Sequence, residues 1–181
     1  MRKIKNEELN RIDTDTFKAS KKLNVIILLD DVRSAMNVGS VFRSSDAFRV
    51  EKIVLCGITA KPPHKEINKT ALGAQEVVEW EHQESAVDYC KTLVEEGYKI
   101  LSVEQADESI SLLDFTPQPE EKYVLVLGNE VFGVSDELIE LSDHVLEIPQ
   151  FGTKHSLNVS VTAGVLIWDF ASKQKKLLAE L

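Results

Sequence analysis

The sequence predicts one α/β domain with a mainly parallel sheet and helices on both faces. Short apolar segments rich in β-branched residues alternate along the chain with segments of helical periodicity, a pattern typical of this fold class. A length of 181 residues, with 43% hydrophobic and 28% charged side chains, suits a single globular core. Every apolar run is far shorter than the roughly 20 residues that cross a bilayer, so we expect no membrane partner.

The first half of the chain begins with a polar segment, residues 1–22, whose structure the sequence does not predict. Residues 24–30 are expected to form a strand buried on both faces, because polar residues bound a short β-branched apolar run there. A helix is expected over 37–48 and a second buried strand over 53–56. Residues 77–80 show a weaker strand pattern.

The same alternation continues in the second half. A helix over 83–96 is expected to end at Gly97, since glycine adopts the left-handed conformation that closes many helices. The remaining strands are expected at 98–103, 123–127 and 145–148, and the remaining helices at 135–141 and 156–175.

The last helix carries apolar residues on two faces, which predicts cover on more than one side, from its own monomer or from a partner subunit. These residues are Leu157, Val161, Val165 and Trp168 on one face, and Val159, Leu166 and Phe170 on the other.

The net charge of −9 argues against a nucleic-acid partner, because phosphate binding depends on Lys and Arg. The charge is unevenly distributed, however. Residues 104–147 contain twelve acids and one base, a local charge of −11 that leaves +2 for the rest of the chain. An RNA-binding face is therefore compatible with the composition, although solvated helix faces and tails explain the basic residues equally well.

Several common chemistries are missing from the sequence. The eight glycines include no Gly-x-Gly-x-x-Gly, no phosphate-binding loop and no Gly-x-Ser-x-Gly, which excludes the usual dinucleotide, nucleotide-triphosphate and serine-hydrolase signatures. The four histidines lack the spacing of a zinc pair, so no metal site is expected. With only Cys56 and Cys90, the chain has no disulfide framework, and we expect a cytoplasmic location.

Three segments follow expected strands, where open α/β sheets place their ligand-binding loops. In the first, Asn37 and Arg43 lie at the start of a helix, and Gly39, one turn before Arg43, is expected to leave space beside the guanidinium for a bulky partner. The alternative is a surface Arg43 paired with Asp46.

The second segment contains Gly128 and Glu130 at the end of a strand. Gly128 is expected to permit close approach of a ligand to the backbone, and Glu130 to accept hydrogen bonds or hold an arginine. The alternative is an ordinary strand-to-helix turn with Ser135 as the helix N-cap.

The third segment places Ser156 and Asn158 at the start of the last helix, where backbone N–H groups and polar side chains are free to receive a ligand. Helix capping explains Ser156, but it does not explain an asparagine inside the first turn, where Asn is a mediocre helix former.

Together these segments resemble the three motifs of the SpoU/TrmH family of RNA ribose 2′-O-methyltransferases, in the SPOUT superfamily. The matching residues are Asn37 and Arg43, then Gly128-Asn129-Glu130, then Ile148-Pro149 with Ser156-Leu157-Asn158. The resemblance covers about residues 24–171 and implies a C-terminal deep trefoil knot, S-adenosylmethionine as methyl donor and an active homodimer. Without it, the rarity of knots would favour an unknotted doubly wound sheet.

The resemblance also implies roles for individual residues. Val103, Gly128, Ile148 and Leu157 are expected to contact the donor, and Arg43, Asn37, Glu130, Ser156 and Asn158 to form the catalytic set. Family members are proposed to use the matching arginine as base. Because Arg normally stays protonated, we expect Arg43 to position the ribose and phosphate and to stabilise the forming alkoxide. Val131 departs from the family pattern, which commonly has glycine there, so the loop is expected to lose easy access to positive φ.

The layout is similar to that of short tRNA guanosine-2′-O-methyltransferases, which favours tRNA, with a D-loop guanosine as target, over rRNA. We expect an RNA-contacting arm over 1–22, a methyltransferase domain over 23–172 and a basic tail over 173–181 that continues the last helix. The alternatives are methylation of rRNA, methylation of a small molecule or protein, and a non-catalytic RNA-binding protein. The expected phosphate contacts are Arg2, Lys3, Lys5, Lys173, Lys175 and Lys176.

Overall fold

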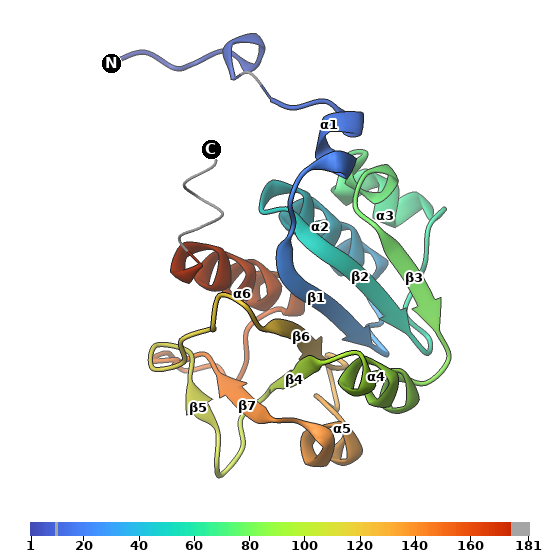
Figure 1. Ribbon diagram of the computed structural model, residues 1–181, viewed down its shortest axis with the longest axis vertical. Helices are drawn as coiled ribbons and strands as arrows, with labels where there is room; N and C mark the ends of the chain where they lie inside the picture. Colours follow the sequence, from blue (N-terminus) through green and yellow to red (C-terminus); the bar gives the residue numbers. More distant parts are fainter. Residues whose placement is uncertain (10, 175–181) are drawn as a thin grey trace.

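A parallel sheet of seven strands forms the centre of the computed structural model, which describes residues 1–9 and 11–174 (Figure 1). The strand order is β3-β2-β1-β6-β4-β7-β5, and every pairing is parallel. The strands are β1 Leu23–Asp30, β2 Val50–Cys56, β3 Trp80–Gln83, β4 Tyr98–Val103, β5 Ile110–Ser111, β6 Lys122–Leu127 and β7 His144–Glu147. The predicted parallel sheet is confirmed, whereas the trefoil knot stays a prediction.

Helices cover both faces of this sheet, as predicted (Figure 1). One hydrophobic cluster packs α2, α3 and α6 against the sheet, and a second packs α4 and α5 against the opposite face. The helical elements are η1 Asn6–Glu8, α1 Thr14–Ala19, α2 Ala35–Ala47, α3 Lys65–Ala71, η2 Ala74–Glu76, α4 Ala86–Glu95, α5 Asp136–Leu141 and α6 Val159–Lys173. Among the described residues, none of these helices is long and apolar enough to cross a membrane.

Strand β1 shows why its residues form a central strand. Val25, Ile27 and Leu29 point into the first cluster, while Ile26 and Leu28 point into the second, and all five are fully buried. A strand buried on both faces needs apolar residues at every position, which explains the continuous apolar run in the sequence.

The region between β2 and α4 differs from the predicted elements. The expected strand at 77–80 begins only at Trp80, because the turn η2 includes a hydrogen bond from the Val78 N–H to the Ala74 carbonyl. Helix α3 occupies a stretch for which the sequence predicted no helix. Its N-cap His64 accepts the Glu66 N–H, and its buried Ile67 packs in the core.

The N-terminal segment is partly helical. Asp13 caps α1 by accepting the Thr16 N–H at 2.7 Å, and Phe17 anchors the helix in the core. Residues 1–9 extend away from the body of the domain (Figure 1). This arrangement suits an arm over 1–22, which stays a prediction.

Helix α6 begins at Val159, three residues later than predicted. The face of α6 that carries Val159, Leu166 and Phe170 is buried in the core. The other apolar face, which carries Val161 and Trp168, is open in the monomer, since these two residues are 52% and 55% exposed. The predicted tail over 173–181 lies, from residue 175 on, outside the described residues.

Candidate active site

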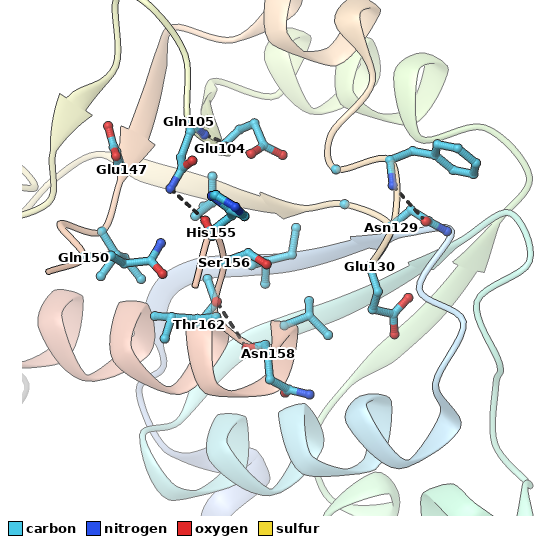
Figure 2. A pocket seen from close by; sticks show the side chains of 18 of the residues that line it. Glu104, Gln105, Asn129, Glu130, Glu147, Gln150, His155, Ser156, Asn158 and Thr162 are labelled. Atoms are coloured by element: carbon cyan, nitrogen blue, oxygen red, sulfur yellow. Dashed lines mark hydrogen bonds between the residues drawn. The ribbon is translucent and has the colours of Figure 1, made fainter. Parts of the chain in front are cut away.

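A cavity of about 540 Å³ lies at the carboxyl ends of β4, β6 and β7. All four residues predicted to contact a donor line it, namely Val103, Gly128, Ile148 and Leu157. Figure 2 shows polar side chains from the segments after these strands converging on the cavity. Its lining comprises residues 103–105, 127–133, 146–148, 150, 155–159 and 162.

Glu130 links the β6 segment to the start of α2. Its Oε2 accepts the backbone N–H of Arg33 at 2.9 Å, and its Oε1 accepts the N–H of Ser34 at 3.1 Å and the Asn37 amide at 3.1 Å. Partial burial tends to raise the pKa of Glu130, but these hydrogen bonds outweigh it and the net direction is downward. Glu130 is therefore an ionised acceptor that holds one wall of the site.

Asn37 extends this connection to the third segment. Its Oδ1 accepts the Asn158 amide at 3.1 Å, so Glu130, Asn37 and Asn158 form one hydrogen-bonded chain. Asn158 is also the N-cap of α6, because its Oδ1 accepts the Ser160 N–H at 2.9 Å. The expectation that capping explains Ser156 and leaves Asn158 unexplained was wrong, since the helix begins at Val159 and Asn158 itself is the cap.

Ser156 and Arg43 have different positions relative to this chain. Ser156 is exposed and lines the cavity, as predicted. Arg43 is exposed on α2, six residues after Asn37, and does not line the cavity. The alternative ion pair with Asp46 does not form among the described residues either.

The expectation for Gly39 was wrong, because other atoms of the chain fill the space expected beside Arg43. A Cβ at Gly39 would lie 2.1 Å from Thr70 Oγ1 and 2.5 Å from the Ile67 carbonyl oxygen, so helix α3 fills the space expected beside Arg43. A Cβ at Gly128 would lie 2.1 Å from the Gly133 carbonyl oxygen. Both glycines therefore permit close packing within the chain. Gly128 also lines the cavity, so its expected contact with a ligand stays a prediction.

The turn from Gly128 to Gly133 tolerates Val131. Asn129 and Gly133 form an isolated bridge, and the only positive φ in this turn is that of Gly133, at 70°. The family's usual glycine at position 131 is thus not needed here for a left-handed residue.

Sequence reasoning missed Glu104 and Gln105, directly after β4. Glu104 accepts the Val134 N–H at 3.2 Å, and Gln105 donates its amide to the His155 carbonyl at 3.1 Å. These contacts tie the β4 segment to the other two segments around the cavity, and Figure 2 shows the one between Gln105 and His155. Their position after a strand was the available signal, the same rule that identified Glu130.

Two of the basic residues expected to contact phosphates already have partners in the structure. Arg2 pairs with Glu8 at 2.6 Å on the surface. The Lys173 ammonium is occupied by the Leu112 and Phe115 carbonyls, each at 2.7 Å, and by Asp169 at 2.9 Å. Lys173 is thus a structural anchor in this fold, which corrects its expected role as a phosphate contact. Lys175 and Lys176 lie outside the described residues.

The cavity suits a donor that carries positive charge and a flat ring. Glu104, Glu130 and Glu147 contribute three carboxylates to its lining, and Val103, Leu146 and Ile148 contribute an apolar part. Carboxylates attract a cationic centre, and apolar side chains bury an aromatic ring. The residues present therefore fit S-adenosylmethionine.

Comparison with known proteins places the chain among RNA-modifying enzymes. The model of the SpoU rRNA Methylase family matches residues 24–168. A relative described as tRNA (guanosine(18)-2′-O)-methyltransferase of Aquifex aeolicus (strain VF5) is 29% identical over 159 residues, which cover 86% of this chain and 72% of that relative.

Two solved structures share the fold. The A. aeolicus TrmH/SpoU tRNA modifying enzyme has a TM-score of 0.80 at 24% identity, covering 90% of this chain and 81% of that chain. The AdoMet-bound rRNA methyltransferase from Sinorhizobium meliloti has a TM-score of 0.77 at 24% identity, covering 84% of this chain and 57% of that one.

Proposed function

We propose that tRNA is the substrate of this chain, which belongs to the SpoU rRNA Methylase family and is an S-adenosylmethionine-dependent RNA 2′-O-methyltransferase. The observation that carries the assignment is the chain of hydrogen bonds that joins Glu130, Asn37 and Asn158 beside the cavity. It unites the three segments that the resemblance identified. A guanosine of tRNA is favoured as target because the A. aeolicus relative is named for guanosine 18 of tRNA.

The donor would lie against Val103, Gly128, Ile148 and Leu157. When bound, S-adenosylmethionine supplies a methyl group already activated on its sulfonium. The protein's own task is then to align a ribose hydroxyl with that methyl and to assist loss of the hydroxyl proton.

Arg43, Asn37 and Glu130 would carry out the alignment. Because Glu130 anchors Asn37 and the backbone that enters α2, it fixes the helix on which Arg43 lies. The protonated guanidinium of Arg43 would hold the ribose and adjacent phosphate and stabilise the alkoxide as it forms. Ser156 and Asn158 would shape the other wall, with Asn158 fixed by its contact to Asn37.

A homodimer would cover the exposed apolar face of α6. The exposed face of α6 presents Val161, Val165 and Trp168 side by side along the helix, and the Trp168 ring lies 5.6 Å from that of Phe48. A contiguous apolar surface on a helix is stabilised when a second surface covers it. A second copy of the chain supplies such a surface with twofold symmetry. A cytoplasmic location is part of the same proposal, because it suits an RNA substrate and two free, buried cysteines.

Methyl transfer to separate RNA pools tests this proposal. Labelled S-adenosylmethionine is incubated with the protein and unmodified tRNA or rRNA, and the digested RNA is analysed for nucleosides. We expect 2′-O-methylguanosine from the tRNA pool. Methylation confined to rRNA would contradict the tRNA proposal but keep the reaction. Donor binding without transfer to either RNA would favour another substrate, and absence of donor binding a non-catalytic RNA-binding role.

A further inference from the structure

Phe132 exposes an aromatic ring at the cavity. The residue is 86% exposed and belongs to the cavity lining. An apolar ring of this size in water is an unfavourable surface that a flat partner would cover. Nothing in the proposed roles of the neighbouring residues uses it.

The turn that carries Phe132 is firmly held. The Oδ1 of Asn129 accepts the N–H groups of Val131 at 2.8 Å and Phe132 at 3.2 Å, while the Asn129 amide donates to the Asp31 carbonyl at 2.8 Å. Two backbone hydrogen bonds between Asn129 and Gly133, at 3.0 and 2.9 Å, close the turn. The backbone beneath the ring is therefore fixed before any ligand arrives, which lowers the entropy cost of binding to it.

The same turn also carries Glu130, two residues before Phe132. Glu130 is directed to Asn37 and the start of α2, whereas Phe132 is left to solvent. One short turn thus contributes both a fixed polar group of the site and an exposed ring to the lining of the cavity.

We propose that Phe132 is the stacking surface for the base of the nucleotide that is methylated. The inference rests on the proposed function. In a nucleotide the 2′-hydroxyl and the base are attached to adjacent ribose carbons, so a hydroxyl delivered to the cavity brings its own base to the rim. Bases of single-stranded or unpaired nucleotides stack on exposed aromatic side chains in RNA-binding proteins.

The test compares Phe132→Ala, Phe132→Trp and the matched control Phe151→Ala. Phe151 is 94% exposed in the segment after β7 but is not part of the cavity lining. RNA affinity is measured by filter binding with S-adenosylhomocysteine present, donor affinity by equilibrium dialysis without RNA, and turnover by methyl transfer. RNA binding is measured without turnover on both tRNA and rRNA. If tRNA is the wrong substrate, the effect of Phe132→Ala appears with rRNA instead, whereas if the stacking role is wrong, it appears with neither RNA.

We expect Phe132→Ala to weaken binding of the methylated RNA about tenfold to a hundredfold, the range for loss of one base stack. Phe132→Trp should retain binding within about threefold, since an indole also stacks, and Phe151→Ala should match the parent protein. Donor affinity should be unchanged in all three. Unchanged RNA binding in Phe132→Ala, or equal loss in Phe151→Ala, would overturn the proposal. So would weaker donor binding, which would assign the ring to the donor, or a lower oligomeric mass, which would assign it to a subunit contact.

Discussion

At the scale of single residues, the site depends on carboxylate and amide side chains that already have partners. Glu130 accepts three hydrogen bonds, and Asn37 both donates to Glu130 and accepts from Asn158. Such fixed groups need little reorganisation when a substrate arrives, which is how preorganised sites lower a barrier. Arg43 differs, because it forms no ion pair with any residue of the described part of the chain.

Replacing Arg43 by alanine should separate catalysis from folding and donor binding. We expect methyl transfer to fall by about two to three orders of magnitude, as when one donor to a developing oxyanion is removed. The unfolding midpoint should change little because the side chain is exposed. Transfer rate, donor dissociation constant and unfolding midpoint are measured together. Lys91→Ala, an exposed cation on α4, is the control, and near-normal turnover in Arg43→Ala would remove Arg43 from the site.

Asp30 makes the stability of the fold depend on pH. Burial, with a smaller contribution from the charge of Asp31, raises the pKa of Asp30 from 3.8 to about 6. A carboxyl with a raised folded-state pKa is favourable when protonated, so stability should fall as pH rises from about 4 to about 6. Asp30→Asn removes that loss, and we expect a gain of about 1 to 2 kcal/mol at pH 8 after allowing for partial exposure.

Urea unfolding of Asp30→Asn and the parent protein at pH 4 and pH 8 measures this effect. The gain should be present at pH 8 and absent at pH 4. Asp107→Asn, at an exposed position after β4, should show no such difference. An equal change at both pH values would mean that titration of Asp30 is not its cause.

At the scale of elements, the close contact of α2 with α3 positions the first segment of the site. Thr70 donates its hydroxyl to the Met36 carbonyl at 3.0 Å, one residue before Asn37. Gly39 permits this contact, since any side chain there would meet the backbone of α3. Helix α3 thus acts as a support for the helix that carries Asn37 and Arg43.

Gly39→Ala should therefore destabilise the protein even though alanine favours helices. The new methyl group has to displace α3, and overpacking of this kind costs about 1 to 3 kcal/mol. Gly164→Ala in α6 is the control, because the nearest atom to its Cβ, Ser44 Oγ, is 3.8 Å away. We expect that control to be neutral or stabilised by up to about 1 kcal/mol. Denaturant unfolding checks both variants, and equal stability of the two would refute this account of Gly39.

At the scale of the whole molecule, the acidic helix α5 lies on one face of the sheet. The acidic helix α5, with Asp136, Glu137 and Glu140, packs on the face opposite α2 and α6 (Figure 1). Negative charge from this helix is thus kept away from the helices that flank the site. This separation reconciles an acidic chain with an RNA substrate.

The open face of α6 predicts the oligomeric state. Val161→Glu places a charge in the proposed subunit contact, so we expect sedimentation to change from the mass of two chains to that of one at micromolar concentration. Leu113→Glu is the control, since Leu113 is a comparably apolar, 75% exposed residue beside β5 and not on α6. A parent protein that sediments as one chain would contradict the homodimer.

The sequence by itself determined the central buried strands and the three segments of the site. β4 begins and ends as predicted, and β1 and β6 differ by one residue, because a parallel strand buried on both faces requires a continuous apolar run. The polar residues that follow these strands predicted the site equally well, because segments after parallel strands lie at the carboxyl edge of the sheet. Glu104 and Gln105 obeyed the same rule and were overlooked.

Only the tertiary structure decided which of these residues meet. Glu130 lies 93 positions from Asn37, and Asn158 lies 121 positions from it, so their contacts depend on a strand order that local patterns do not encode. Tertiary packing also decided that α3 occupies the space where a side chain at position 39 would lie. It likewise decided that the face of α6 with Val161 and Trp168 stays exposed in the monomer. Periodicity records that a residue is apolar and on which face it lies, whereas long-range packing decides what covers that face.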